Sequence, residues 1–108
     1  MTTPVPAPLQ AFIDATNRGD SEAFNSVFAE DAVLDDWGRM FHGRDGVASW
    51  NRTDNIGKQA HFEVLGVNIT DGGAGVTLTV DVSGNGFNGV SDLDFRLADG
   101  QITSLIIG

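Results

Sequence analysis

Apolar residues near the start of the chain recur at the spacing of a helix. Leu9, Phe12, Ile13 and Thr16 lie at positions i, i+3, i+4 and i+7, which places them on one face of an amphipathic helix. Gly19 ends this pattern, because glycine readily takes the left-handed conformation that follows many helices. The spacing therefore predicts a first helix that stops just before Gly19.

A second, shorter helix is expected directly afterwards. Asp20 can cap its first turn by accepting a hydrogen bond from a backbone N–H group. Its apolar face is predicted to consist of Ala23, Phe24, Val27 and Phe28. Together the two segments predict an αα-hairpin.

The pattern changes from residue 32 onwards. A short strand, a turn at residues 35–38 and a second short strand are expected, followed by a third helix over about residues 44–54. Val47 and Trp50 lie three residues apart and share a face of this helix. This helix is the last one that the pattern predicts.

The second half of the chain alternates between apolar and polar residues, as half-buried strands do. A β-bulge at Gly66 would turn Phe62, Val64, Val67 and Ile69 inward and leave His61 outside. Helices that precede hairpin-linked strands indicate an α+β fold with helices on one face of the sheet. The predicted strands cover residues 61–70, 76–83, 92–97 and 102–107.

Composition restricts the class of protein further. The 108 residues suffice for one domain with one core, and 15 acidic against 6 basic residues give a net charge of −9. Nucleic acid and anionic membrane surfaces would repel this charge, so neither is an expected partner. The chain has no Cys, which excludes disulfides and thiolate metal sites. Because the first ten residues lack a basic and apolar leader, we expect a cytoplasmic protein.

Four strings in this order resemble the nuclear transport factor 2-like superfamily, and within it the SnoaL-like polyketide cyclases and ketosteroid isomerases. They are residues 12–20, 28–33, 41–47 and 87–107. The resemblance spans nearly the whole chain and implies a single SnoaL-like domain over residues 1–108. The implied fold is a cone-shaped α+β barrel, with three N-terminal helices packed on a curved, mainly antiparallel sheet. It also implies a mainly apolar pocket and, commonly, a homodimer.

The resemblance points to Asp36 as the candidate catalytic residue. Its position after the first strand matches the carboxylate that serves as general base in ketosteroid isomerases, where it moves a proton next to a carbonyl group. A carboxylate among apolar groups suits this role, and Trp37 and Phe41 are near in sequence. Asp35 competes for the position, since one of the two acids can instead hold the turn. Which of them faces the pocket stays open.

Two departures separate the chain from the isomerases. The isomerases hold the developing enolate with a Tyr hydroxyl, which Phe12 replaces here, and with a protonated acid, which Leu93 replaces. Steroid isomerisation by that mechanism is therefore disfavoured. Two interpretations remain: an isomerase or cyclase that transfers a proton on an apolar carbonyl compound, or a module of the same fold that only binds a ligand or dimerises.

Further residues are candidates for contact with a small apolar or cyclic ligand. Trp37 and Trp50 are predicted to ring the pocket mouth, with core packing as the alternative. Asp54 either contacts the ligand or caps its helix, and His61 either enters the pocket or stays on the surface. Two isolated His residues lack the spacing of a metal site, so neither a metal nor another cofactor is expected. The ligand-binding prediction comprises Phe12, Leu34, Trp37, Phe41, Trp50, Asp54, His61 and Leu93.

The string Gly84 to Gly89 matches the glycine pattern of dinucleotide-binding proteins. That pattern binds pyrophosphate only where it opens a helix, because the helix N-terminus holds the phosphates. Here a strand is expected to follow. The string is therefore interpreted as a loop without a dinucleotide.

Overall fold

The computed structural model describes residues 4–108. None of the helices in this part of the chain is long and apolar enough to cross a membrane. The elements follow the order that the sequence predicts. The helices are α1 (Ala7–Arg18), α2 (Ser21–Ser26) and α3 (Gly43–Asp54), with 3₁₀ turns at Ile56–Lys58 and Asp71–Gly73. The strands are β1 (Phe28–Asp36), β2 (Arg39–His42), β3 (His61–Thr70), β4 (Gly75–Ser83), β5 (Gly89–Ala98) and β6 (Gln101–Ile107).

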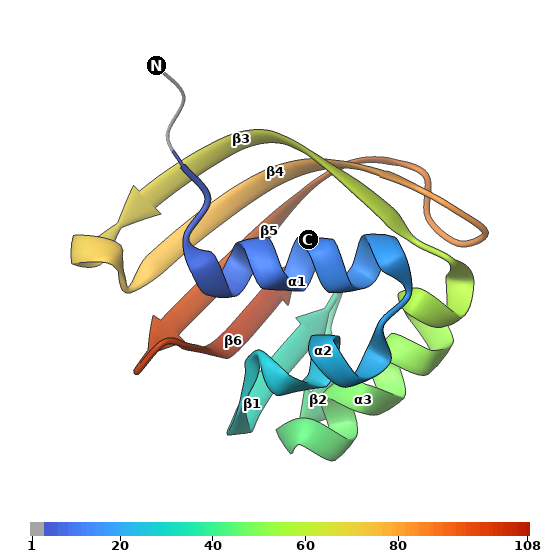
Figure 1. The fold of residues 1–108 in the computed structure, drawn as a ribbon, viewed down its shortest axis with the longest axis horizontal. Coiled ribbons are helices and arrows are strands. Elements are labelled where there is room, and N and C mark those ends of the chain that lie inside the picture. The colour runs from blue at the N-terminus through green and yellow to red at the C-terminus, as the bar shows by residue number, and fades with distance from the viewer. Residues whose placement is uncertain (1–3) are drawn as a thin grey trace.

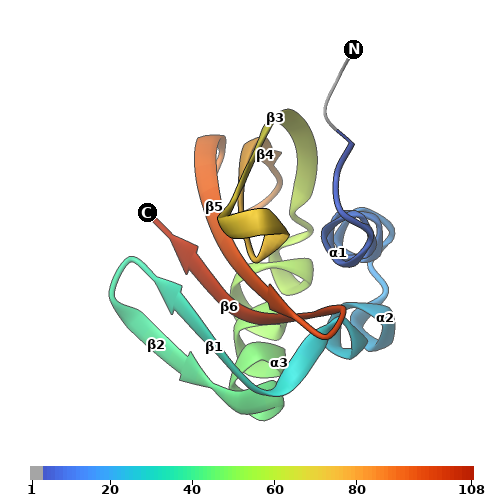
Figure 2. The ribbon, with the colours of Figure 1, turned by 90° about the vertical axis from the view of Figure 1, so that its left-hand side faces the viewer.

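The strands form one curved sheet in the order β2-β1-β6-β5-β4-β3. All neighbouring strands are antiparallel except β1 and β6, which run parallel. The helix α1 lies across the concave face of the sheet, and α3 lies beside β1 and β2 (Figures 1 and 2). This arrangement confirms the predicted α+β fold of three helices on a curved, mainly antiparallel sheet.

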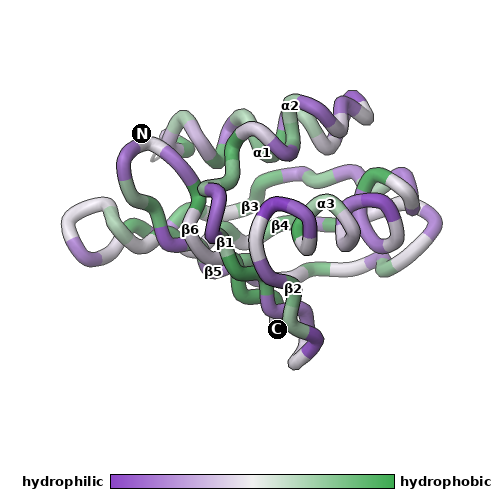
Figure 3. The backbone as a smooth tube through the Cα atoms, turned by 90° about the horizontal axis from the view of Figure 1, so that it is seen from below, coloured by the Kyte–Doolittle hydropathy of each residue, from purple (hydrophilic) through white to green (hydrophobic). Residues whose placement is uncertain are grey.

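The first helix forms as its spacing predicts. Leu9, Phe12, Ile13 and Thr16 are buried, and apolar and polar segments alternate along α1 in Figure 3. Gly19 ends the helix with a φ of 71°, and its N–H group points to carbonyl oxygens of the last turn. The buried face that the hydrophobic periodicity predicts therefore packs into the core.

The second helix is shorter than predicted, and Phe28 does not belong to it. Asp20 caps the helix, because its Oδ1 accepts a hydrogen bond from the Ala23 N–H group at 3.0 Å. The helix ends at Ser26, and Phe28 begins β1, where it pairs with Ile102 of β6. Sheet pairing with a strand more than 70 residues away thus overrides the helical spacing.

Phenylalanine rings join the helices to the sheet. The ring centroid of Phe12 lies 5.3 Å from those of Phe24 and Phe95. It lies 5.7 Å from the centroid of Phe62 and 6.1 Å from that of Phe28. Such distances suit the offset and edge-to-face contacts that aromatic rings prefer. One residue of α1 therefore contacts α2, β1, β3 and β5 together.

The predicted bulge in β3 is present, since the pairing with β4 shifts between Val64 and Gly66. Phe62 is buried and His61 is exposed, as expected. Ile69 was expected to point inward, but it is 43% exposed. The reason is that this end of β3 projects beyond the start of α1 (Figure 1), so that no helix covers it.

Candidate functional site

A cavity of about 280 Å³ opens at one end of the sheet, between the strands, α3 and the loop of residues 84–88. This volume is near the lower end of the range of small-molecule sites, roughly 300–1,000 Å³. The charged residues of the lining come from β1, β2, α3 and the 3₁₀ turn that follows α3. They are Asp36, Arg39, Asp54 and Lys58. The apolar lining includes Phe12, Phe62, Val82, Leu93 and Ile107.

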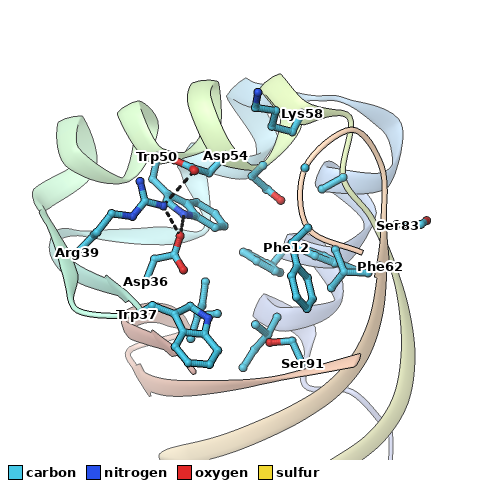
Figure 4. A pocket seen from close by; sticks show the side chains of 17 residues that line it. Phe12, Asp36, Trp37, Arg39, Trp50, Asp54, Lys58, Phe62, Ser83 and Ser91 are labelled. Carbon is cyan, nitrogen blue, oxygen red and sulfur yellow. Dashed lines mark hydrogen bonds and ion pairs between the residues drawn. The ribbon is translucent and has the colours of Figure 1, made fainter. Parts of the chain in front are cut away.

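Six of the nine predicted site residues line this cavity. Figure 4 shows Asp36, Trp50 and Asp54 on one wall, with Phe12 on the other. Trp37 lies at the end of the hairpin, and its side chain is 77% exposed. The residues brought together are Phe12, Asp36, Trp37, Trp50, Asp54 and Leu93.

The three others lie elsewhere, each for a reason in the strand geometry. Leu34 is fully buried in the core. It lies two residues before Asp36 in β1, and only the end of this strand, at Asp36, reaches the cavity. Phe41 packs half-buried against the core cluster, and the Arg39 guanidinium lies 5.6 Å from its ring centroid. His61 faces outward and borders a separate groove near the end of α1.

The turn between β1 and β2 divides the roles of the two neighbouring acids. The Oδ1 atom of Asp35 accepts a hydrogen bond from the Gly38 N–H group at 2.7 Å. Trp37 and Gly38 have φ values of 53° and 88°, and positive φ at both central residues is the condition for a type I′ turn. Asp35 therefore holds the turn, while Asp36 faces the cavity.

One oxygen of the Asp36 carboxylate is fixed and the other is free for a ligand. Its Oδ2 atom accepts hydrogen bonds from Arg39 Nη2 at 2.6 Å and from Trp50 Nε1 at 3.0 Å (Figure 4). Within residues 4–108 no group donates to its Oδ1 atom. The side chain is 16% exposed. The carboxylate is thus held in one orientation at the edge of an apolar cavity.

Arg39 connects the hairpin to α3. Its Nη2 atom also lies 3.0 Å from Asp54 Oδ1, and hydrogen bonds to Asp54 and then Asp36 raise the pKa of Arg39 above its ordinary value. Burial alone would raise the pKa of Asp54. Hydrogen bonds from Thr53 and Arg39 and the charges of Arg39 and Lys58 outweigh burial, so the pKa of Asp54 lies below its ordinary value of 3.8.

This shift predicts how stability depends on pH. Because the pKa of Asp54 is lower in the folded than in the unfolded chain, its ionisation stabilises the fold above pH 3.8. The contribution is lost as the pH falls through the folded pKa. We expect the difference in unfolding free energy between the wild type and Asp54→Asn to be constant at neutral pH and to shrink below about pH 4. Chemical unfolding at a series of pH values measures it, and a constant difference down to about pH 2 would contradict the prediction.

Buried amides fix the end of α3, from which Trp50 and Asp54 project. The Asn55 amide donates to Thr16 Oγ1 and to Asn51 Oδ1, both at 3.1 Å. The Asn51 amide donates to Ser21 Oγ at 3.2 Å. These bonds tie α3 to α1 and to the start of α2, and buried polar networks of this kind rigidify the groups they connect.

Sequence analysis missed several cavity residues. Arg39 could have been found, because a two-residue turn pairs it with Asp36 across the hairpin and places both on the same face. Lys58 and Phe87 lie in a 3₁₀ turn and a loop, where no periodic pattern indicates which way a side chain points. Among residues 4–108 no cluster of three or more His, Asp and Glu side chains is arranged to hold a metal ion.

The fold agrees with a sequence comparison. The profile of the SnoaL-like domain matches residues 9–105, which is most of the chain. The chain belongs to the SnoaL-like domain family. No curated protein sequence matches this SnoaL-like chain.

Three solved structures with the same fold illustrate this similarity. A Sinorhizobium meliloti protein provisionally assigned as a polyketide cyclase is 24% identical, with a TM-score of 0.87 over 96% of this chain and 95% of its own. The Δ5-3-ketosteroid isomerase of a Mycobacterium species is 18% identical, with a TM-score of 0.81 over 99% and 93%. A Mycobacterium tuberculosis protein in complex with estradiol-17β-hemisuccinate is 14% identical, with a TM-score of 0.82 over 93% and 88%. At these identities the likeness shows a shared fold.

Proposed function

We propose that this SnoaL-like protein binds a small, largely apolar ring compound with a carbonyl group and transfers a proton on it. The observation that carries the proposal is the Asp36 carboxylate at the boundary of the apolar cavity. Arg39 and Trp50 hold its Oδ2 atom, and its Oδ1 atom takes no hydrogen bond from residues 4–108. A carboxylate that is fixed in this way is positioned to accept a proton from a bound ligand.

The proton would come from a carbon next to the carbonyl group. Its removal leaves negative charge on the carbonyl oxygen, and this charge needs a hydrogen-bond donor or a cation. Lys58 also lines the cavity, and no carboxylate of residues 4–108 lies within ion-pair distance of its amine. The Lys58 amine points away from the cavity centre in Figure 4, and we propose that this side chain turns inward to stabilise the enolate. The same Asp36 carboxyl group would return the proton to another carbon or to water.

A second candidate function is ligand binding without chemistry. Phe12 and Leu93 line the cavity where isomerases of this fold are expected to carry enolate-stabilising donors, so neither of these two positions supplies a donor. Two solved structures of the same fold support this alternative. One is the Mycobacterium tuberculosis protein in complex with estradiol-17β-hemisuccinate, and the other is a computationally designed 17-OHP binder. Such a binder would hold the ring compound unchanged.

Hydrogen–deuterium exchange distinguishes the two functions without knowledge of the natural substrate. Cyclic and aryl ketones are incubated with the protein in D₂O, and the loss of their α-proton NMR signals is followed. A proton-transfer enzyme exchanges these protons faster than buffer does. Saturable binding with exchange at the buffer rate would overturn the catalytic proposal and support the binder.

We also propose that two copies associate through the sheet face that points away from the helices. Met40 and Ile106 lie on this face in one row with Asp35, and they are 50% and 46% exposed. We expect sedimentation at micromolar concentration to give twice the mass of one chain, and Ile106→Lys to give single chains. Leu65→Lys, at an exposed position of the far edge strand, is the control that stays dimeric. A monomeric wild type would contradict this assignment.

A further inference from the structure

The string Gly84 to Gly89 leads into the strand β5 and not into a helix, so it lacks the geometry of a dinucleotide site. It carries another chemistry, because it contains Asn85-Gly86 and Asn88-Gly89, the two places in the chain where glycine follows asparagine. A glycine has no Cβ atom to shield its backbone nitrogen, and this nitrogen attacks the side-chain Cγ atom of the preceding asparagine. The surroundings of each pair therefore decide whether it reacts.

The second pair is held on both sides. The Asn88 Nδ2 atom donates to the carbonyl oxygens of Gly84 at 2.9 Å and Gly86 at 3.1 Å. Its Oδ1 atom accepts a hydrogen bond from the Gly84 N–H group at 3.3 Å. Gly89 begins β5, where it pairs with Val82 of β4. An attack by the Gly89 nitrogen on Asn88 would have to break these contacts, so the structure opposes it.

The first pair is open by comparison. Asn85 and Gly86 are both exposed in the loop of residues 84–88. In the described part of the chain, the Asn85 side chain makes a single hydrogen bond, from Nδ2 to Oε1 of the exposed Gln59 at 3.0 Å. Within residues 4–108 the Gly86 N–H group donates no hydrogen bond. The attacking nitrogen and the Cγ atom are thus not fixed as in the second pair, and water reaches both.

We propose that Asn85 is a site of spontaneous deamidation in this protein and that Asn88 is protected from it. The Gly86 nitrogen gives up its proton and forms a bond to Asn85 Cγ, the bond between Cγ and Nδ2 breaks, and ammonia leaves. The product is a succinimide ring. Water then opens the ring at one or the other of its C–N bonds, which leaves aspartate or isoaspartate at position 85. Water is the only co-reactant.

The modified residue lies where the loop docks on the segment after α3. The Asn85 N–H group donates to the Lys58 carbonyl oxygen at 2.8 Å. Gly84 lies so close to this segment that a Cβ atom on it would come within 2.7 Å of the Gln59 carbonyl oxygen. Isoaspartate adds one carbon atom to the backbone at this contact, and aspartate places a negative charge beside Gln59 Oε1. We expect the modified loop, which borders the cavity, to separate from Lys58.

Incubation of the purified protein in mildly alkaline buffer tests the site, with peptide mass spectrometry following each asparagine separately. We expect Asn85 to deamidate at least about tenfold faster than Asn88, because three hydrogen bonds hold the Asn88 side chain. The same incubation in concentrated guanidinium chloride is the control, since unfolding removes these bonds and the two Asn-Gly pairs should then react at similar rates. Equal rates in the folded protein, or the same difference in the unfolded one, would overturn the assignment.

Hydrogen–deuterium exchange tests the effect on the loop. The backbone amide of residue 85 should exchange slowly in fresh protein, because it donates to Lys58, and at least about tenfold faster after deamidation. Asn85→Gln keeps a side-chain amide, but its extra methylene group disfavours ring closure, so this variant should keep the fresh exchange pattern after the same incubation. If protein modified at Asn85 exchanged like fresh protein, the separation of the loop would be wrong. Both measurements are made without a ligand, so neither depends on the proposed function.

Discussion

Asp36→Asn is expected to slow enzyme-dependent α-proton exchange by roughly a hundredfold to ten-thousandfold, the range that a positioned general base supplies. The amide keeps the shape of the side chain and an oxygen that can accept the Trp50 indole N–H bond. It has no lone pair basic enough to take a proton from carbon. The loss should therefore appear in the exchange rate, while the affinity for the ketone changes little.

Asp35→Asn is the control for this variant. Asp35 is the adjacent acid, but its Oδ1 atom accepts a hydrogen bond from the Gly38 N–H group and holds the turn. An asparagine oxygen can accept the same bond. We expect Asp35→Asn to exchange α-protons at the wild-type rate. If Asp36→Asn retained that rate, or if the two variants lost it equally, Asp36 would not be the base.

Phe24→Ala is expected to cost about 3–5 kcal/mol of unfolding free energy, as truncation of a buried phenylalanine does. Phe24 is fully buried, and its ring centroid lies 5.3 Å from that of Phe12 and 5.2 Å from that of Phe28. Trp50 stacks on it at 6.2 Å, so the cavity left behind would also loosen the indole that holds Asp36. A small domain has only about 5–15 kcal/mol of stability in total.

Denaturant unfolding measures this loss. Phe87→Ala removes the same atoms from a ring that is 59% exposed, so its cost should stay below about 1 kcal/mol. Because both variants replace phenylalanine with alanine, a difference in their unfolding free energies reports the burial of the ring and not the type of residue. Similar losses for the two variants would contradict the packing described for α1, α2 and α3.

Much of the fold was predictable because its signals are local. The spacing of Leu9, Phe12, Ile13 and Thr16 predicts α1, and strict alternation predicts β4 and β5. The placement of Phe28 was predicted wrongly, because its partner Ile102 lies at the other end of the chain. A parallel pairing between β1 and β6 leaves no mark in a short window of sequence, so periodicity could not find it.

The candidate site was predictable only in part. The position of Asp36 followed from a family resemblance, while the choice between Asp35 and Asp36 depends on the register of a hairpin. That register also brings Arg39 to Asp36, which the sequence analysis did not predict. Loop residues such as Phe87 have no periodic signal at all. The contacts of Asp36 therefore depend on the pairing of β1 with β2, which only the folded chain defines.

The central claim is that a ring ketone binds between Asp36 and the apolar wall, and the two tryptophans test it most directly. Trp37 and Trp50 are the two tryptophans of the chain, and both line the cavity. An amide-correlation NMR spectrum therefore shows two indole N–H signals, one of them from the group that donates to Asp36. Titration with 2-acetylnaphthalene should shift both signals with one common affinity. Unmoved indole signals, with shifts confined to the groove near His61, would contradict the account.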